Sequence, residues 1–327
     1  MKIIHFSFAI FAVISFLGCE QKKSELTEIA AIPVSVTSSA CPGVAPSGDF
    51  IADRIPGANT TNVEPGLYEG PVWINGALYF SDFTFGSGFP SRIQRLDANE
   101  EMTTAINDSG SNGLAVDAQG NIVAGTHKFK SLSRYNIATG ERTSVVEQFN
   151  GNVFNSPNDL TLATDGTIYF TDPSFQRDAA PGGQEKTNVF RAATDGTVTV
   201  VDDAIANPNG IALSPAGDVL YVSGGGEKGF LRAYPIVNGV PQAGKNLVTD
   251  VNIPDGMAVD CLGNIYVTEH TAQRLRVFTP SGKQIATVKV DAKITNVAFG
   301  GVRGKTLFIT GAGSVWKLEL DVTGSPY

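Results

Sequence analysis

The segment NDLTLATDGTIYFTD, residues 158–172, shows a pattern that recurs along the chain and determines the fold. The pattern is an oxygen-bearing residue, usually followed by Gly or Asp, then an alternating apolar strand, a polar turn and a second apolar strand. The other copies are EGPVWINGALYFSD (69–82), NGLAVDAQGNIVAG (112–125), NGIALSPAGDVLYVSG (209–224), DGMAVDCLGNIYVTE (255–269) and NVAFGGVRGKTLFIT (296–310). Successive copies begin 41 to 51 residues apart, which suits a four-stranded propeller blade of roughly 40 to 50 residues. The sequence therefore predicts an all-β fold, a six-bladed β-propeller.

Equivalent positions in the blades of a propeller come to the same height around one axis. The residues that open the copies should therefore form a ring near one mouth of the central channel: Glu69, Asn112, Asn158, Asn209, Asp255 and Asn296. Their oxygen atoms suit a hard divalent cation such as calcium better than zinc or copper. Alternatively, Asn and Asp only stabilise the turn before each strand, and we expect this for Asn112 and Asn296. Turn chemistry does not account for Glu69, whose side chain is too long for that contact.

Composition agrees with one large β domain that binds a small molecule. Hydrophobic residues make up 42% of the chain and charged residues 17%, with 36 glycines for strands and turns. The net charge of -8 and the lack of a basic stripe argue against nucleic acid as a partner. We expect a monomer whose partner is a small ligand, either neutral or bound to the metal.

The N-terminus has the features of an exported bacterial lipoprotein. Lys2 precedes an apolar run, Ile3 to Leu17, that is too short to span a bilayer. The following FLGCE resembles a lipobox, which predicts a signal peptide over residues 1–18 and lipidation of Cys19. Acyl chains on Cys19 would anchor the protein stably, and Glu20 favours the outer membrane, facing the periplasm. An ordinary signal peptide with an incidental Cys is the alternative.

The next segment, residues 19–47, is polar and rich in Ser and Ala, which indicates a flexible tether before a propeller at residues 48–327. We expect a strand at about residues 48–56 to pair with the last blade, because an open ring would expose edge strands. With Cys19 lipidated, Cys41 and Cys261 remain as an even pair in an oxidising compartment. They either form a disulfide or stay as two free thiols.

Several of these motifs, taken in order, resemble a known family. They are EGPVW at Glu69, SPNDLTLATDGTIYFTDPSF from Ser156, NPNGIALSPAGDVLYVSG from Asn207, IPDGMAVDCLGNIYVTE from Ile253 and TNVAFGGVRGKTLFIT from Thr295. Together they resemble the gluconolactonase branch of the senescence marker protein (regucalcin) and gluconolactonase superfamily. The resemblance implies a six-bladed propeller with a divalent metal, commonly calcium, in its channel and lactone hydrolysis as its activity. It also implies metal ligands at Glu69, Asn158, Asn209 and Asp255.

The residue types fit ester hydrolysis, which needs a polarised carbonyl, an activated water and stabilisation of an oxyanion. We assign Asp255 as the base, following the resemblance, and Asp159 as a second catalytic candidate that orients substrate. Asn158 is also a candidate substrate contact.

His127 and His270 follow strand pairs at the channel mouth, so each either contacts substrate or serves a structural role. Around His127 the stretch GTHKFKSLSR lacks a Glu that related gluconolactonases carry, which leaves the substrate open.

The favoured function is a calcium-dependent hydrolase that opens the ester ring of a lactone, preferably a glucono-type sugar lactone. One alternative is a paraoxonase-like arylesterase or phosphotriesterase. Another is a propeller that binds a ligand without catalysis, because the fold alone does not decide function. Two acids and two amides that converge on the axis favour the enzyme.

Overall fold

The computed structural model describes residues 41 and 43–325. These residues are almost entirely β-structure, with two short 3-10 helices, η1 (Arg177–Ala179) and η2 (Gly226–Lys228). Within this part of the chain no helix has the length and apolar character that a membrane span requires. The predicted signal peptide and the lipidation site Cys19 lie outside the described residues.

The first three sheets each contain four antiparallel strands. The first contains β3 (Gly66–Ile74), β4 (Ala77–Thr84), β5 (Ser91–Leu96) and β6 (Met102–Ile106). The second contains β7 (Ser111–Val116), β8 (Ile122–Thr126), β9 (Ser131–Tyr135) and β10 (Arg142–Val146), and the third contains β13 (Leu160–Leu162), β14 (Ile168–Asp172), β15 (Asn188–Ala192) and β16 (Val198–Asp202). A hairpin of β11 (Gln148–Phe149) and β12 (Asn152–Val153) connects the second sheet to the third.

The last three sheets repeat this plan with additions. The fourth contains β17 (Ile211–Leu213), β18 (Val219–Gly224), β19 (Gly229–Val237) and β21 (Lys245–Val251), with β20 (Val240–Pro241) paired to the end of β19. The fifth contains β22 (Pro254–Val259), β23 (Ile265–Glu269), β24 (Arg274–Phe278), β25 (Gln284–Lys289) and β1 (Gly48–Ile51). The sixth contains β26 (Ile294–Gly300), β27 (Thr306–Gly311), β28 (Val315–Glu319) and β2 (Asp53–Arg54).

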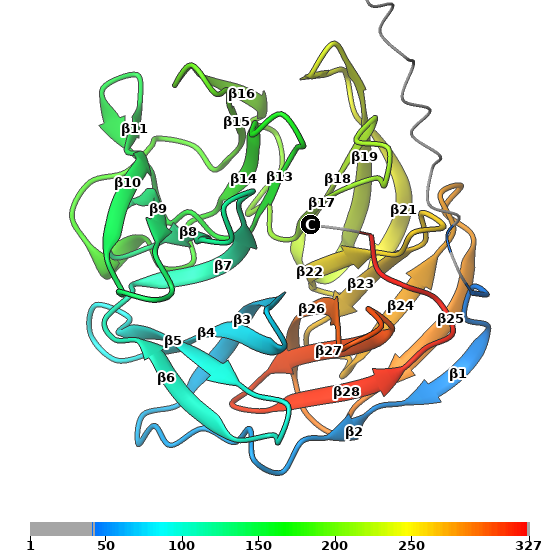
Figure 1. The fold of residues 1–327 in the computed structure, drawn as a ribbon. Coiled ribbons are helices and arrows are strands. Elements are labelled where there is room, and N and C mark those ends of the chain that lie inside the picture. The colour runs from blue at the N-terminus through cyan, green and yellow to red at the C-terminus, as the bar shows by residue number, and fades with distance from the viewer. Residues whose placement is uncertain (1–40, 42, 326–327) are drawn as a thin grey trace, which may run out of the picture. The chain divides into compact units, whose positions relative to one another are not determined.

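The sheets follow one another around a central axis as blades. The first strands of successive blades, β3, β7, β13, β17, β22 and β26, contact one another in turn, and β26 contacts β3 to complete the circle (Figure 1). Apolar side chains fill the space between neighbouring blades. For example, Phe154, Phe170 and Phe190 pack with ring centroids 5.1 to 5.3 Å apart against Leu132 of the blade before them. The predicted six-bladed propeller is therefore confirmed.

The segment that precedes the first blade closes the circle of six blades. As expected, Asp53 and Arg54 of β2 pair with Lys317 and Trp316 in the last blade. The expectation is incomplete for β1, which instead pairs in parallel with β25 of the fifth blade. Ala52 turns the chain from one blade to the other, and its buried side chain packs in the core between them. One segment thus covers the outer edges of two blades.

A disulfide joins Cys41 to Cys261, in the turn between β22 and β23. Next to it Gly43 forms an isolated β-bridge with Val322, and the amide of Val44 donates to the carbonyl of Asp321 at 2.7 Å. The described part of the predicted tether is therefore fastened to the end of the propeller opposite the ring residues.

Close contact between neighbouring blades requires glycine directly after a ring residue. A Cβ on Gly113 would lie 2.4 Å from the carbonyl oxygen of Asn158, and one on Gly210 would lie 2.3 Å from that of Asp255. At Gly256 the clash would be with the side chain of Asn296, at 2.0 Å. The repeated Asn-Gly and Asp-Gly pairs thus let each ring residue contact the next blade.

We predict that Gly256→Ala lowers the free energy of unfolding by roughly 1–3 kcal/mol, because the new methyl group overpacks the contact with Asn296. Urea denaturation of the variant and the parent measures this difference. Gly86→Ala is the matched control, since its nearest neighbour would be the hydroxyl of Thr84 at 3.3 Å. An equal effect of the two substitutions would refute the claim that this blade contact is tight.

Candidate functional site

The residues that open the repeats come together at the axis. The side-chain amide of Asn296, through Nδ2, donates to Oε2 of Glu69 at 3.2 Å and to Oδ2 of Asp159 at 3.3 Å. Glu69 lies in the first blade, next to the sixth blade that carries Asn296, whereas Asp159 lies in the third blade, so the contact with Asp159 crosses the channel. The side chains of Glu69, Asn158 and Asp255 are also buried. The repeat-opening residues Glu69 and Asn296 are therefore in contact, as the repeat predicts.

Irregular strand pairing places several of these side chains. The register between the first two strands shifts between Glu69 and Val72, and at the corresponding point in the second, fifth and sixth blades. Such bulges bend a strand locally and redirect a side chain. We attribute the inward direction of the ring residues to this repeated irregularity, which the sequence analysis did not anticipate.

Hydroxyl side chains fix the backbone that carries the ring. The hydroxyl of Thr171 donates to the carbonyl of Asn209 at 2.7 Å, and that of Ser223 donates to the carbonyl of Asp255 at 2.8 Å. Each hydroxyl lies in the second strand of one blade and reaches the ring residue of the next. Sequence reasoning missed these positions, although a Ser or Thr recurs there in five of the six copies of the pattern.

Three buried carboxylates give the site a strongly negative character. Burial, together with repulsion from Asp255 and Asp159, raises the pKa of Glu69 well above its usual range. Burial also raises the pKa of Asp159 to about 7, although the amide of Asn296 partly opposes this. The pKa of Asp255 is raised by burial as well, against the opposing effect of His270 and Asn209. A cation in the channel would relieve this repulsion.

The donor atoms fit a hard cation. Oδ1 of Asn112 is buried and has no hydrogen-bond partner among the described residues, so a cation or a donor group would satisfy it. Within the same residues no three His, Cys, Asp or Glu side chains gather as a metal site. The predicted set instead combines two carboxylates with the amide oxygens of Asn158 and Asn209, as oxygen-liganded calcium sites often do.

Two ring residues were expected to serve only turns. Oδ1 of Asn296 does accept the backbone amide of Val297 at 2.8 Å, but its nitrogen contacts Glu69 and Asp159, so turn chemistry describes only half of its role. For Asn112, whose oxygen has no such local contact within the described residues, the turn interpretation is not supported. Sequence alone could not show which way these amides point.

His270 lies beside the ring, as predicted. Its Nδ1 is 2.6 Å from the carbonyl oxygen of Ile294 and 3.4 Å from Oδ2 of Asp255. Burial would lower the pKa of His270, but the hydrogen bond and the attraction of Asp255 outweigh it and raise the pKa. Because Nδ1 faces these acceptors, Nε2 is directed away from them. His270 is thus placed to orient Asp255.

His127 is enclosed by the loop after β4. Its Nε2 donates to the carbonyl of Phe89 at 2.6 Å, and the rings of Phe83 and Phe89 lie edge-on to it. Burial lowers the pKa of His127 to about 4, so its imidazole is neutral at pH 7. The side chain is fully buried, which gives it a role in holding this loop. Its contact with substrate stays a prediction.

Asp172 is a positioning residue that the sequence analysis did not single out. Its carboxylate accepts the backbone amides of Asn155 and Ser156 at 2.9 and 2.8 Å and so shapes the loop that leads to Asn158. Nζ of Lys130 donates to the carbonyl of Asn155 at 2.7 Å from the neighbouring blade. The signal that could have found Asp172 is the acid that ends the second strand in several repeats.

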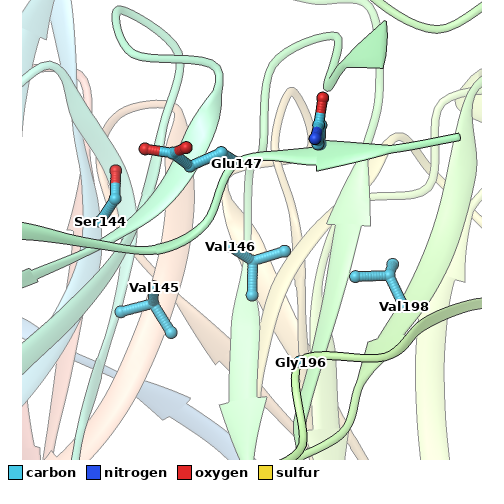
Figure 2. A pocket seen from close by; sticks show the side chains of 7 residues that line it. Ser144, Val145, Val146, Glu147, Gly196 and Val198 are labelled. Carbon is cyan, nitrogen blue, oxygen red and sulfur yellow. The ribbon is translucent and has the colours of Figure 1, made fainter. Parts of the chain in front are cut away.

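A cavity of about 440 Å³ lies away from the ring, between the outer strands of the second and third blades (Figure 2). It is lined by Ser144, Val145, Val146, Glu147, Gln148, Gly196 and Val198. None of the predicted site residues lines it. Its side chains offer neither a buried polar cluster nor a nucleophile with a base, so we place the candidate site at the ring.

Comparisons with known proteins agree with the fold. The protein family described as the SMP-30/gluconolactonase/LRE-like region matches residues 67–313 of this chain. A gluconolactonase of Zymomonas mobilis is 28% identical over 290 residues, which cover 78% of this chain and 79% of that protein. The structure of a gluconolactonase from Xanthomonas campestris aligns with a TM-score of 0.70 and 26% identity, over 86% of this chain and 97% of that one. A calcium-binding regucalcin from Agrobacterium tumefaciens aligns with a TM-score of 0.68 and 20% identity, over 86% and 97%.

We predict that His127 makes the protein less stable in mild acid. The folded pKa of about 4 lies below the ordinary value of 6.5, so the unfolded chain binds the proton first and stability falls as pH drops through this window. Between pH 7 and pH 5 the loss attributable to His127 should be about 2 kcal/mol.

His127→Gln keeps a donor for the carbonyl of Phe89 but cannot titrate. Urea unfolding of the parent and this variant at both pH values isolates the contribution of the imidazole. The parent should lose more stability than the variant. Parallel losses would mean that His127 is not held neutral by burial.

Proposed function

The chain belongs to the SMP-30/gluconolactonase/LRE-like family, and from this premise we propose that it is a calcium-dependent hydrolase that opens the ester ring of a sugar lactone. The names of the related gluconolactonases support lactone hydrolysis as the activity. The observation that carries the proposal is that the amide of Asn296 contacts both Glu69 in the adjacent blade and Asp159 across the channel. The two contacts bring the proposed ligand Glu69 and a second carboxylate, that of Asp159, to one amide group.

The proposed metal ligands are Glu69, Asn158, Asn209 and Asp255. Two carboxylates balance a divalent charge, and two neutral amides complete the set without adding repulsion. When bound there, a calcium ion would polarise the lactone carbonyl and stabilise the developing oxyanion. The name of the calcium-binding regucalcin with the same fold supports this choice of metal.

Asp255 is the proposed base for the attacking water. Its Oδ2 faces Nδ1 of His270 at 3.4 Å, and the hydroxyl of Ser223 holds its backbone carbonyl. Asp255 is therefore held through one carboxylate oxygen and through its backbone carbonyl, and the other carboxylate oxygen would accept the proton from water. Asp255 is thus proposed both to bind the metal and to accept the proton. Because its side chain is already held in place, it need not reorient during the reaction.

Asp159 is proposed to orient the substrate. It follows the ligand Asn158, and Leu160 donates its amide to Oδ1 of Asp159 at 3.1 Å, while Oδ2 contacts Asn296. A carboxylate held in this way can accept a hydroxyl of a bound sugar lactone. The names of the related gluconolactonases support a lactone of this class. An arylesterase or phosphotriesterase remains the alternative chemistry.

We also propose export and lipid anchoring through Cys19, on the sequence argument given above. The disulfide between Cys41 and Cys261 supports an oxidising compartment. The protein would then act as a monomer on the periplasmic side.

We predict that Asp255→Asn lowers lactone hydrolysis by about a hundredfold or more, because it removes charge and basicity from one position while the shape is kept. Hydrolysis of D-glucono-1,5-lactone and an aryl ester is measured with calcium and with a chelator. Asp49→Asn is the control, since it removes the same charge from an exposed side chain on β1, outside the ring.

Equal activity of Asp255→Asn and the parent would show that the site is wrongly assigned. A parent that hydrolyses neither ester with calcium present would favour a binding propeller instead. Preference for the aryl ester over the lactone would favour the alternative chemistry.

A further inference from the structure

Phenylalanine occupies the same repeat position in three consecutive blades. In each blade one residue of the second strand lies opposite the ring residue, and the chain runs from that residue toward the channel mouth. The residue four positions further along the chain is Phe85 in the first blade, Phe129 in the second and Phe175 in the third. The same position in the remaining blades holds Glu227, Ala272 and Ser314. At this position the first three blades therefore carry an aromatic residue and the last three do not.

Phe85 stands well above the level of the ring. Its backbone amide donates to the carbonyl of Pro65 at 2.9 Å, which extends the pairing of β3 and β4 beyond the strands. Pro65 precedes Glu69 by four residues, and a strand rises about 3.3 Å per residue, so this level is about 13 Å from the ring. Phe85 is thus at the entrance to the channel, where a group attached to a bound lactone would extend.

Two of the three rings are open to solvent. Phe85 is 52% exposed and Phe175 is 45% exposed. Phe129 differs, because the guanidinium of Arg142 lies 3.9 Å from its ring centroid and covers one face. Single exposed apolar side chains are ordinary on a protein surface. Two at the same repeat position beside a candidate active site are a reason to expect a ligand.

The loops that carry these rings form one connected wall. A Cβ on Gly88, in the loop of the first blade, would lie 4.0 Å from the carbonyl oxygen of Ala179 in the loop of the third. His127 in the second blade donates to the carbonyl of Phe89, and Nζ of Lys130 donates to the carbonyl of Arg177 at 2.7 Å. The wall is therefore held in place before a ligand arrives, which lowers the cost of binding.

We propose that Phe85 and Phe175 form a subsite for an apolar alkyl or aryl substituent of the lactone, attached at a ring carbon remote from the ester carbonyl. A phenyl ring has no polar atom to offer a hydroxyl, so it selects for hydrocarbon. This inference rests on the proposed lactonase function and deepens it, because it names the substituent that the mouth accepts in addition to the lactone ring.

The effect should grow with the length of the substituent. A fully buried methylene contributes about fourfold in affinity, and a methylene that stays half exposed about twofold. From a methyl to a pentyl substituent, four added methylenes should therefore increase kcat/KM by roughly tenfold or more.

The test compares three proteins: the parent, the double variant Phe85→Ala/Phe175→Ala, and the control Val302→Ala. Val302 is fully exposed in the turn between β26 and β27, at the end of the blade opposite the ring. Each protein is assayed with calcium on γ-lactones whose alkyl substituent is lengthened from methyl to pentyl. The parent and Val302→Ala should share the increase with chain length, and the double variant should lose it while it still hydrolyses the methyl compound.

The outcomes separate this inference from the function on which it rests. Hydrolysis without any dependence on chain length, or an unchanged dependence in the double variant, would overturn the subsite and leave the lactonase intact. If no lactone is hydrolysed, the proposed function fails, and calorimetric binding of the corresponding γ-alkyl lactams, which resist hydrolysis, decides the subsite. The subsite is supported if longer lactams bind more tightly to the parent but not to the double variant. It is refuted if chain length has the same effect on binding to both proteins.

Discussion

The contact of Asn296 with Glu69 and Asp159 depends on how closely six blades approach one axis. Glycine after the ring residue allows that approach, since a single Cβ at Gly113 or Gly210 would collide with the backbone of the next blade. Hydroxyls such as that of Thr171 then fix the neighbouring carbonyls. The site is thus a product of the packing between blades, and no single blade contains it.

The same packing explains the electrostatics. Burial of these acids and their mutual repulsion raise the pKa of Glu69, and the amide of Asn296 partly offsets the rise. Such an arrangement is unfavourable for the fold alone, because buried charges cost free energy unless they are compensated. A divalent cation and a polarised ester would provide that compensation. The buried acids therefore lower the stability of the fold at the same place where we propose the reaction occurs.

The repeat, its period and the residues that open it could be read from the sequence, because period-two strands and tight turns are local signals. The disulfide was foreseen only as one of two alternatives, since spacing cannot report the distance between Cys41 and Cys261. The reach of Asn296 across the channel was missed because it depends on bulges and on side-chain direction. The pairing of β1 with the fifth blade was also missed, since one Ala52 decides where the chain crosses over.

The central claim is that the ring residues form a cation site, and calorimetric titration of calcium into chelator-treated protein tests it most directly. The account predicts one bound ion per chain, with binding strongly weakened in Glu69→Gln, which removes a charged ligand, and retained in Asp49→Asn, which removes an exposed charge on β1. Measurable binding of equal strength in all three proteins would place the ion elsewhere. No heat of binding to the parent protein would contradict the account.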